Sequence, residues 1–306
     1  YVYTYTFTLL RDTPPTHSAS STAERYVKYF DICSLRHIFH KASKLFMRPE
    51  CVNMEFVGES ILTWFDSRPH HALHGWPFVD LSSAAAMLAT YALAVKMGCA
   101  YMMSREAIKF PAANFAYNLV QIALCAYMTI SAVVIAVENG YSPICNRFVM
   151  TKQAPMARLL WLFYMSKYLD FCDTFFIVAG KKWRQLSFLH VYHHTSVAFF
   201  YWINSNVNYD GDIYLTIVLN AGIHFFMYLY YFVSTHTPDV WWKKYLTLAQ
   251  ICQFVVMMAQ AAILVVVPNC SAVAPRINKT YFLYVLSMFV LFVQFYLGNY
   301  KHKKAA

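Results

Sequence analysis

Residues 113–137 read ANFAYNLVQIALCAYMTISAVVIAV, a stretch without a single charged side chain. An α-helix rises about 1.5 Å per residue, so this stretch is long enough to cross a hydrocarbon core of about 30 Å. Similar stretches of mostly apolar residues recur from position 76 to the end of the chain. The stretch therefore predicts a transmembrane helix, and its recurrence predicts an all-α, polytopic membrane protein.

The apolar stretches predict seven transmembrane helices. They lie at 77–97, 113–137, 157–179, 186–204, 212–234, 245–267 and 280–299. We expect three parts in the chain: a poorly defined N-terminal leader over 1–75, partly disordered or interfacial, a seven-helix bundle over 76–300, and a basic cytosolic tail over 301–306.

The composition of the 306 residues agrees with this architecture. Hydrophobic residues make up 59% and charged residues 13%, whereas soluble domains carry about 25% charged residues. These values exclude a disordered chain, a coiled coil, a collagen-like fibre and a small disulfide scaffold. A net charge of +10 would suggest nucleic acid as the partner of a soluble protein, but here the basic residues lie between apolar spans. Membrane topology explains them, so we expect no nucleic-acid partner.

The basic residues also give the orientation of the spans. The connections after the first, third and fifth spans, with the tail, hold ten Lys and Arg residues, and the other connections hold four. The positive-inside rule then places the C-terminus in the cytosol. The chain ends in Lys303-Lys304-Ala305-Ala306, which is either an endoplasmic-reticulum retrieval signal or a basic flank at the membrane. We expect the protein in the endoplasmic-reticulum membrane.

Two features lie in connections that this orientation places in the lumen. Asn269-Cys-Ser and Asn278-Lys-Thr match the acceptor sequence for N-glycosylation. Cys145 and Cys270 both lie where oxidation is possible. The two cysteines either form a disulfide or stay free thiols, and the two sequons are either glycosylated or left unused close to the membrane.

Polar side chains inside a span are costly and usually mark function. In the third predicted span the spacing i, i+3, i+6, i+7 puts one polar group of residues on a single helical face. These residues are Lys167, Asp170, Asp173 and Thr174. A structural Lys–Asp pair would explain only part of this group, and two carboxylates with one ammonium at mid-span favour a site.

The fourth span contains a histidine box. His190, His193 and His194 follow the spacing i, i+3, i+4 and therefore share one face. A single histidine on an apolar face is usually a buried core residue, whereas three in one span rarely are. Imidazole can act as a ligand, a base or a nucleophile near neutral pH. This cluster is therefore the main candidate for chemistry.

The next two spans each carry one polar stripe as well. The stripes are Asn220, His224, Met227, Tyr228 and Tyr231 in the fifth span, and Thr247, Gln250 and Gln253 in the sixth. Hydrogen bonding between helices would by itself explain the second stripe. Because four consecutive spans present a polar face, the simplest packing turns these faces toward a common interior. We expect an occluded chamber around the histidines, suited to a reactive polar head with a long alkyl tail.

Three functions are compatible with such a chamber. A di-iron desaturase or hydroxylase would use HxxHH as a ligand box, with His70 and His74 in a second box, but the scattered histidines after the cluster are too few. We therefore expect no metal. Acyl transfer would use one imidazole as nucleophile on a thioester and a second as proton shuttle, with Asn220, Tyr228 or Gln250 as oxyanion donors. A seven-helix lipid receptor or transporter would use the stripes for binding alone.

At these stripes the sequence resembles the very-long-chain fatty acid elongase (ELO) family, the membrane 3-ketoacyl-CoA synthases. LHVYHH at 189–194 is similar to the family's LHxYHH box, and KYLDFCDT at 167–174 to its KxxExxDT. NAGIHFFMYLYY at 220–231 resembles NxxxHxxMYxYY, and TLAQICQF at 247–254 resembles TxxQxxQF. Four motifs in the family's order, on four consecutive spans, make the resemblance specific.

The resemblance implies an enzyme activity and a tunnel. It covers about residues 77–304 and departs at Asp170, where the family more often has Glu. The implied reaction condenses a long-chain acyl-CoA with malonyl-CoA, releases CO2 and CoA, and yields a 3-ketoacyl-CoA two carbons longer. The bundle would enclose an acyl-chain tunnel and bind no cofactor. Gln185, five residues before His190, resembles the branch of the family that acts on polyunsaturated chains.

The resemblance also implies roles for single residues. His193 would be the nucleophile, with His190 and His194 as bases or orienting residues. His224 would contact the thioester or the enolate from the opposite helix. The residues implied to bind or orient the substrate are Lys167, Asp170, Asp173, Asn220, Tyr228, Gln250 and Gln253. The implied partners are acyl-CoA, malonyl-CoA, the lipid bilayer and the other enzymes of the elongation cycle, and a homo-oligomer is compatible with the sequence.

Overall fold

The computed structural model describes most of the chain from position 72 onward. The described residues are 60–61, 63, 72–149, 154–237 and 240–300. Most of the predicted leader over 1–75, including His70 and His71, lies outside them. The same holds for the whole predicted tail over 301–306 and its pair Lys303 and Lys304.

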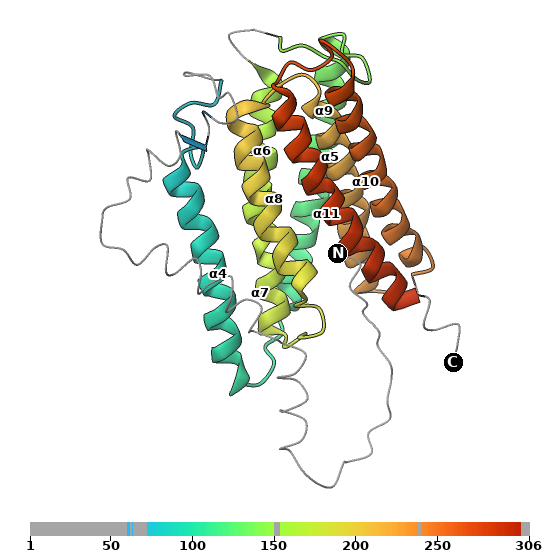
Figure 1. Cartoon of the computed structure of the whole chain (residues 1–306). Coiled ribbons are helices and arrows are strands. Elements are labelled where there is room, and N and C mark those ends of the chain that lie inside the picture. Colours follow the sequence, from blue (N-terminus) through green and yellow to red (C-terminus); the bar gives the residue numbers. More distant parts are fainter. Residues whose placement is uncertain (1–59, 62, 64–71, 150–153, 238–239, 301–306) are drawn as a thin grey trace.

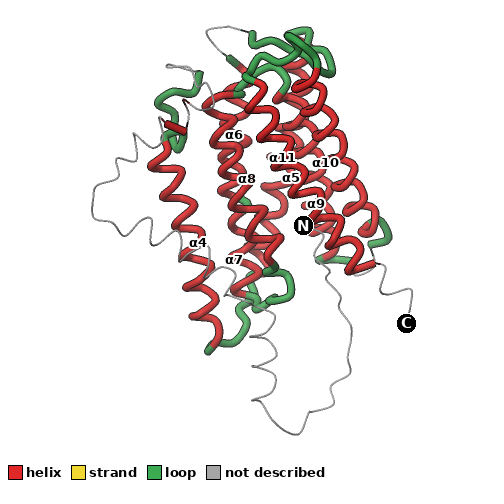
Figure 2. The backbone as a smooth tube through the Cα atoms, viewed as in Figure 1, coloured by secondary structure: helices red, strands yellow, loops and turns green. Residues whose placement is uncertain are grey.

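The described residues form helices and no strand. The helices are α4 (Leu81–Met103), α5 (Pro111–Glu138), α6 (Pro155–Leu169), α7 (Phe171–Ala179), α8 (Phe188–Val207), α9 (Ile213–Ser234), α10 (Lys243–Val266) and α11 (Pro275–Tyr300). Figures 1 and 2 show them as long rods that run side by side, with the loops gathered at the two ends of the bundle. The prediction of an all-α protein is confirmed.

Five helices in the described part of the chain can cross a membrane by length and composition. They are α4, α5, α9, Tyr245–Val266 within α10 and Pro275–Gly298 within α11. Helix α8 has 20 residues but is more polar, because it carries the histidine box and the segment Asn204–Asn206. Helices α6 and α7 are each shorter than a span. The structure thus confirms five of the seven predicted spans, and the other two stay predictions.

The third predicted span, 157–179, is divided at Asp170 into α6 and α7. The Asp170 backbone keeps helical angles, with φ −60° and ψ −17°, and its N–H donates to the Ser166 carbonyl. The Asp173 N–H donates to the Asp170 carbonyl at 3.1 Å, a bond across three residues that tightens the turn. Side chains of α5 and α9 hold the Asp170 carboxylate, so the break lies where the helix is tied to its neighbours.

Short polar side chains and prolines set where the helices begin. The Asp80 carboxylate accepts a hydrogen bond from the Ser83 N–H at 2.8 Å and caps α4. The Ser187 hydroxyl accepts one from the His190 N–H at 3.2 Å and caps α8. Helices α5, α6 and α11 each begin with proline, whose missing N–H costs nothing at that position. The Ser187 cap therefore fixes the helical turn that carries the first histidine.

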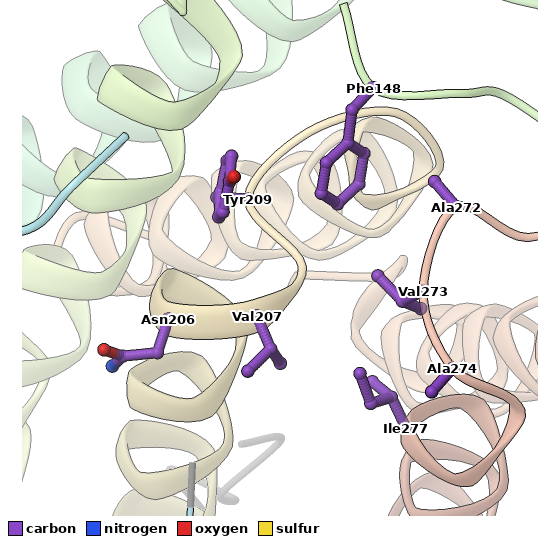
Figure 3. A pocket seen from close by; sticks show the side chains of 8 residues that line it. All are labelled: Phe148, Asn206, Val207, Tyr209, Ala272, Val273, Ala274 and Ile277. Atoms are coloured by element: carbon purple, nitrogen blue, oxygen red, sulfur yellow. The ribbon is translucent and has the colours of Figure 1, made fainter. Parts of the chain in front are cut away.

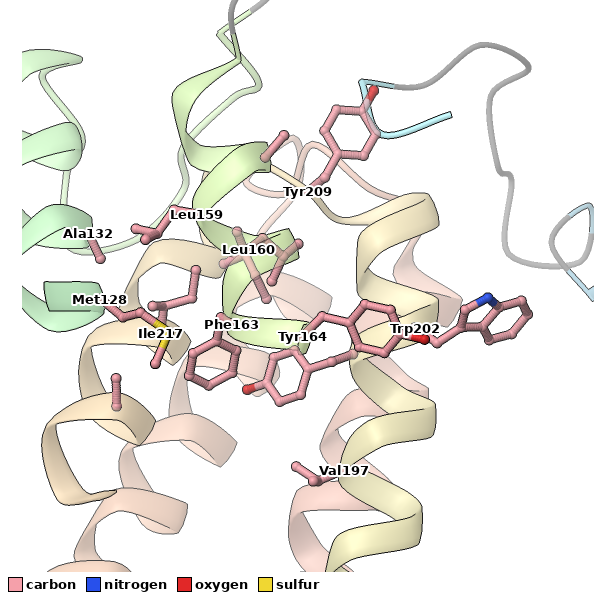
Figure 4. Packing of buried hydrophobic residues seen from close by; sticks show 14 of the residues in the cluster. Met128, Ala132, Leu159, Leu160, Phe163, Tyr164, Val197, Trp202, Tyr209 and Ile217 are labelled. Atoms are coloured by element: carbon pink, nitrogen blue, oxygen red, sulfur yellow. The ribbon is translucent and has the colours of Figure 1, made fainter. Parts of the chain in front are cut away.

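Large side chains fill the centre of the bundle. Figure 4 shows Phe163 and Tyr164 of α6, Trp202 of α8 and Ile217 of α9 in one packed cluster. All four are almost completely buried. Phe163 packs edge-to-face against Tyr201, with ring centroids 4.6 Å apart, a favoured aromatic geometry. This cluster holds α6, α8 and α9 together beside the predicted site.

The outer faces of the helices are also apolar. Met97 of α4, Val137 of α5 and Val266 of α10 are among the most exposed large hydrophobic residues. On a soluble protein so much exposed apolar surface would mark an interface or an aggregation risk. Around a bundle with membrane-spanning helices it is the surface that lipid covers, because hydrocarbon solvates it without cost.

One end of the bundle holds the α5–α6, α8–α9 and α10–α11 connections (Figure 1), and we call it the disulfide end. Cys145 and Cys270 are bonded there and join the first of these connections to the last. The Tyr141 hydroxyl donates to Asp210, and Asn146 donates to Asp212 at 2.9 Å from its side chain. Burial raises the pKa of the Tyr141 hydroxyl, and the bond to Asp210 raises it further.

The two glycosylation sequons at this end differ in how exposed their asparagines are. Asn269 is exposed in the α10–α11 connection. The prediction that Asn278 lies in that connection is wrong, because α11 begins at Pro275 instead of residue 280. Asn278 is only 3% exposed, and its side-chain amide donates to the Ser271 hydroxyl at 2.8 Å. Of the two asparagines, Asn269 is the accessible one.

Candidate active site

The three histidines of the box lie near the start of α8, close to the α7–α8 connection. This opposite end of the bundle is called the histidine end. His190, His193 and His194 are 1%, 6% and 0% exposed. The ring centroids of His190 and His194 are 4.4 Å apart, and those of His193 and His194 are 5.6 Å apart. All three face the interior of the bundle, as their spacing predicts.

Helix α9 adds a fourth histidine across from the box. His224 is buried, and its ring is stacked toward that of His193 at an angle of 23°, with the centroids 6.4 Å apart. Phe292 of α11 packs against the same His193 ring at 6.5 Å. The structure therefore pairs His193 with His224 across two helices.

The ring of His190 is fixed by a hydroxyl chain. Its Nε2 lies 2.7 Å from the Thr174 hydroxyl of α7, and this hydroxyl lies 3.1 Å from that of Tyr91 on α4. Tyr91 stacks on Phe171, with centroids 4.1 Å apart. A hydroxyl can donate or accept, so this chain can hold either tautomer of the imidazole. The occupied Nε2 makes His190 better suited to orienting its neighbours than to nucleophilic attack.

Lys167 is buried in a polar contact between α6 and α9. Its Nζ lies 3.4 Å from the Asp170 carboxylate and 3.3 Å from the Asn220 side-chain oxygen. The ammonium also lies over the Phe163 ring, 4.2 Å from the centroid. Lys167 and Asp170 are both almost fully buried, so each charge depends on the other for compensation. The predicted Lys–Asp pair is present, and it reaches the polar stripe of α9.

A second set of bonds ties the carboxylates to α5 and α9. The Gln121 amide nitrogen donates to Asp170 at 2.8 Å and lies within 3.1 Å of the Tyr228 hydroxyl. The Tyr228 hydroxyl is 2.9 Å from Asp173 and 3.2 Å from Asp170. Tyr117 of α5 lies 2.9 Å from the Gln121 nitrogen. One hydrogen-bond network beside the histidines thus includes Asp170, Asp173, Asn220 and Tyr228.

The sequence patterns do not single out four residues that the structure places in or beside the site: Gln121, Tyr117, Tyr91 and Phe292. For Gln121 a signal exists, because it and Tyr117 are four residues apart on one face of an otherwise apolar span, and polar groups within spans mark function. Tyr91 and Phe292 give no such signal. An aromatic residue in an apolar helix has the same pattern whether it faces lipid or a site, and only packing reveals which.

The polar stripe of α10 is buried on one face, as its spacing predicts. Thr247, Gln250 and Gln253 are 0%, 4% and 5% exposed. The Gln253 amide nitrogen contacts the Met257 sulfur at 3.3 Å. The stripe continues into Phe254, which packs on Phe292 with centroids 5.0 Å apart. Since Phe292 also packs on His193, α10 borders the histidine site.

Three oxygen atoms of this stripe have no hydrogen-bond partner among the described residues. They are Oγ1 of Thr247, Oε1 of Gln250 and Oε1 of Gln253. A buried polar atom without a partner costs free energy, so native proteins usually satisfy such atoms with protein, water or a ligand. A column of three such atoms beside the histidines suits a polar, flexible ligand that offers donors along its length.

The acidic, histidine and cysteine residues in the described part of the chain form no candidate metal site. In residues 72–149, 154–237 and 240–300, together with 60–61 and 63, no three His, Cys, Asp or Glu side chains converge as ligands of a metal ion. His74, assigned to a second histidine box in the di-iron alternative, is exposed on the segment before α4.

The chain is similar to known proteins over most of its length. Residues 76–306 match the model of the ELO family, described as the GNS1/SUR4 family. Very long chain fatty acid elongase 2 of Mus musculus is 34% identical over 238 residues, which cover 76% of this chain and 80% of the mouse protein. Very long chain fatty acid elongase 5 of Tachysurus fulvidraco is 33% identical over 264 residues, 83% of this chain and 88% of that protein.

The human very long chain fatty acid elongase 5 is 32% identical over 271 residues, which cover 83% of this chain and 87% of the human protein. The match to the family model includes every helix from α4 to α11. It therefore includes the histidines of α8 and α9, the carboxylates of α6 and α7, and the stripe of α10. The chain belongs to the ELO (GNS1/SUR4) family.

Proposed function

We propose that this protein is a fatty acid elongase of the acyltransferase class, a very-long-chain 3-oxoacyl-CoA synthase. It condenses a long-chain acyl-CoA with malonyl-CoA and forms CO2, CoA and a 3-ketoacyl-CoA. Relatives that cover most of the chain are named very long chain fatty acid elongases. The observation that carries the proposal is the buried pair of His193 and His224 across α8 and α9, because it offers a nucleophile and a second imidazole side by side, away from solvent.

The proposed architecture has seven spans, with α6 and α7 together forming one and α8 another. The histidine end faces the cytosol, where both CoA esters are dissolved. The basic residues Lys181, Lys182 and Arg184 in the α7–α8 connection at that end agree with the positive-inside rule. The disulfide end then faces the lumen of the endoplasmic reticulum, where cysteines are oxidised.

The first half of the proposed reaction is acyl transfer to His193. A neutral imidazole nitrogen attacks the carbonyl carbon of the thioester, the carbon–sulfur bond breaks, and CoA leaves as a thiol after taking up a proton. The proton comes from the other ring nitrogen of His193, through a neighbouring histidine. The product is an acyl-imidazole, which is itself reactive, so one difficult step becomes two easier ones.

The second half consumes malonyl-CoA. Its carboxylate leaves as CO2, and the remaining carbanion attacks the carbonyl carbon of the acyl-imidazole. The carbon–nitrogen bond then breaks, and the imidazolate that leaves takes up a proton from water through a neighbouring histidine, which restores neutral His193. His224, whose ring centroid lies 6.4 Å from that of His193, is placed to contact the thioester oxygen or the enolate. His190 and His194 orient the His193 ring.

The polar network contributes positioning and charge. The Tyr228 hydroxyl is directed at Asp170 and Asp173, so we assign it to positioning and not to the oxyanion. The Asn220 side-chain oxygen accepts from Lys167, and its amide nitrogen remains a donor for a developing oxyanion. In this way the ion pair on α6 orients a donor on α9.

The stripe of α10 is proposed to hold the pantetheine arm that acyl-CoA and malonyl-CoA share. This arm carries two amide N–H groups, which match the buried oxygens of Gln250 and Gln253 that accept no bond from a described residue. No resident cofactor is needed. We further propose a preference for polyunsaturated chains, supported by Gln185 and HVYHH.

The test uses membranes that contain the protein, a panel of acyl-CoAs, radiolabelled malonyl-CoA and a strong iron chelator. We expect chelator-resistant label in a product two carbons longer, and loss of this label in His193→Ala. His236→Ala is the matched control, because His236 is exposed at the end of α9. Near wild-type turnover by His193→Ala would overturn the nucleophile assignment, and no labelled product with any acyl chain would refute the function.

A further inference from the structure

Three connections between helices meet at the disulfide end of the bundle. Figure 3 shows one side chain from each around a common space: Phe148 from the α5–α6 connection, Tyr209 from α8–α9 and Val273 from α10–α11. The rings of Phe148 and Tyr209 pack with their centroids 5.1 Å apart. The residues that follow Tyr209 are Asp210-Gly211-Asp212, which we call the acidic turn. The acidic turn therefore lies close to the connection that carries Cys145.

The middle residue of the acidic turn allows a close approach of two backbones. Gly211 has φ +66°, a conformation that glycine adopts readily. A Cβ at this position would lie 3.0 Å from the Asn146 carbonyl oxygen and 3.4 Å from that of Arg147. Any other residue would force the two backbones to shift, so glycine keeps the two flanking carboxylates within reach of the α5–α6 connection.

Asp210 holds two points of that connection on either side of Cys145. One carboxylate oxygen accepts a hydrogen bond from the Tyr141 hydroxyl, and the other accepts one from the Val149 N–H at 2.8 Å. Tyr141 precedes Cys145 by four residues, and Val149 follows it by four. Asp210 therefore closes the segment around the cysteine into a loop.

Asp212 holds the middle of the same loop. Its carboxylate accepts the Asn146 backbone N–H at 3.0 Å and the Asn146 side-chain amide at 2.9 Å. It also accepts the N–H of Cys145. Asp212 is only 7% exposed, and hydrogen bonds to an ionised acceptor are about twice as strong as neutral ones. Three donors from two consecutive residues thus converge on one buried carboxylate.

The backbone of Cys145 needs such support. Its φ of 69° lies in the left-handed region, which is costly for a residue with a Cβ and persists only where the surroundings hold it. A left-handed residue lets successive N–H groups point at one anion. The N–H groups of Cys145 and Asn146 do so at Asp212. The carboxylate therefore stabilises the conformation in which the cysteine is held.

The acidic turn is also tied to the helix that leads to Cys270. The side-chain amide of Gln260 on α10 donates to the Asp212 carbonyl at 3.0 Å, and Gln260 is 4% exposed. Helix α10 ends at Val266, four residues before Cys270. Asp212 thus contacts both sides of the disulfide, because its carboxylate holds Cys145 and its carbonyl holds α10.

We propose that the acidic turn is a positioning device for the disulfide, which holds Cys145 in place for bonding to Cys270 while both are still thiols. Ordering a loop costs conformational entropy, and a loop that is ordered beforehand does not pay this cost when the bond forms. In the reaction, the two thiols pass two electrons and two protons to glutathione disulfide, which becomes two molecules of glutathione. This inference does not depend on the proposed elongase function.

The test equilibrates the whole chain, in detergent, with glutathione buffers of increasing reducing power. Differential alkylation and mass spectrometry then give the fraction of Cys145 that is bonded to Cys270. Asp212→Asn keeps the shape of the side chain but removes the charge and turns an amide NH2 toward the donors. The ratio of squared glutathione to glutathione disulfide at half-reduction should fall about tenfold, the factor that corresponds to the loss of one charge-assisted hydrogen bond.

Glu138→Gln is the matched control. It removes the same charge from an exposed residue at the end of α5, so its midpoint should equal that of wild type. Elution of the oxidised protein as a single species in size-exclusion chromatography reports whether a variant is folded. If Asp212→Asn fails this check, Asn146→Ala decides, because it removes one donor, leaves the carboxylate in place and should shift the midpoint in the same direction. An unchanged midpoint in the folded variant would show that other contacts position Cys145, and would overturn the inference.

Discussion

The buried pair of Lys167 and Asp170 leads to a sharp prediction about stability. In Lys167→Met the side chain keeps its length and can still cover the Phe163 ring, but the Asp170 carboxylate loses its only cationic partner among the described residues. Gln121 and Tyr228 still donate to that carboxylate. Two neutral donors do not compensate a buried charge, so the folded state should be strongly destabilised.

Removing one partner of a buried ion pair costs about 3–5 kcal/mol. At about 2–4 °C per kcal/mol, the midpoint of thermal unfolding should fall by about 6–20 °C. Adding Asp170→Asn removes the uncompensated charge and keeps an acceptor oxygen for Gln121. The double variant Lys167→Met/Asp170→Asn should therefore recover most of the loss.

The assay is thermal unfolding of the four proteins of this double-mutant cycle in one detergent. A coupling free energy of more than about 1 kcal/mol between the two sites is expected, because contacting residues are not additive. If the double variant loses as much stability as the two single variants together, the pair does not compensate charge and the reasoning is refuted. Elongase activity of the double variant should stay low, since Asn220 loses the Lys167 donor.

Two further predictions concern the hydroxyl chain and the disulfide. Thr174→Val keeps the shape of the side chain but removes the hydrogen bond to His190. Because a buried polar group left unpaired costs about 1–3 kcal/mol, kcat of the Val variant should fall about tenfold or more, whereas Thr174→Ser should keep kcat near that of wild type. Equal kcat values for the Val and Ser variants would show that the hydroxyl does not position the imidazole. Replacing Cys145 and Cys270 by Ala should lower the free energy of unfolding by about 2–5 kcal/mol. The measurement compares this double variant with wild type, with and without reductant. If the reductant lowers the free energy of unfolding of the double variant as much as that of wild type, the reductant acts on a different bond.

Sequence patterns predict best where the determinant is local. The length of an apolar run and its 3.6-residue period are properties of one segment, so the helices and the inward faces of His190, His193 and His194 agree with the structure. The α10 stripe is buried as predicted for the same reason. Local patterns define helix ends less sharply: α11 begins at Pro275, so Asn278 lies in a buried helical turn and not in the connection.

Contacts between helices could not be predicted in the same way. Gln121 joins the site only because α5 packs against α6 and α9, and its sequence neighbours do not reveal which face is inside. The break at Asp170 likewise arises from side chains of two other helices. For Cys145 and Cys270 the sequence left a bond and free thiols both open, and only the proximity of two loops decided between them.

The disulfide also orders the events of biosynthesis. Its two cysteines are separated by 125 residues, and the segment between them contains α6 to α10. Cys145 is translated before those helices exist, and its partner emerges only after α10 is complete. Ribosomal synthesis is directional, so Cys145 must remain reduced, or be held by an oxidoreductase, until the α10–α11 hairpin has entered the membrane. A nascent chain released before that hairpin would expose a reactive thiol, which is a chemical mark of unfinished assembly.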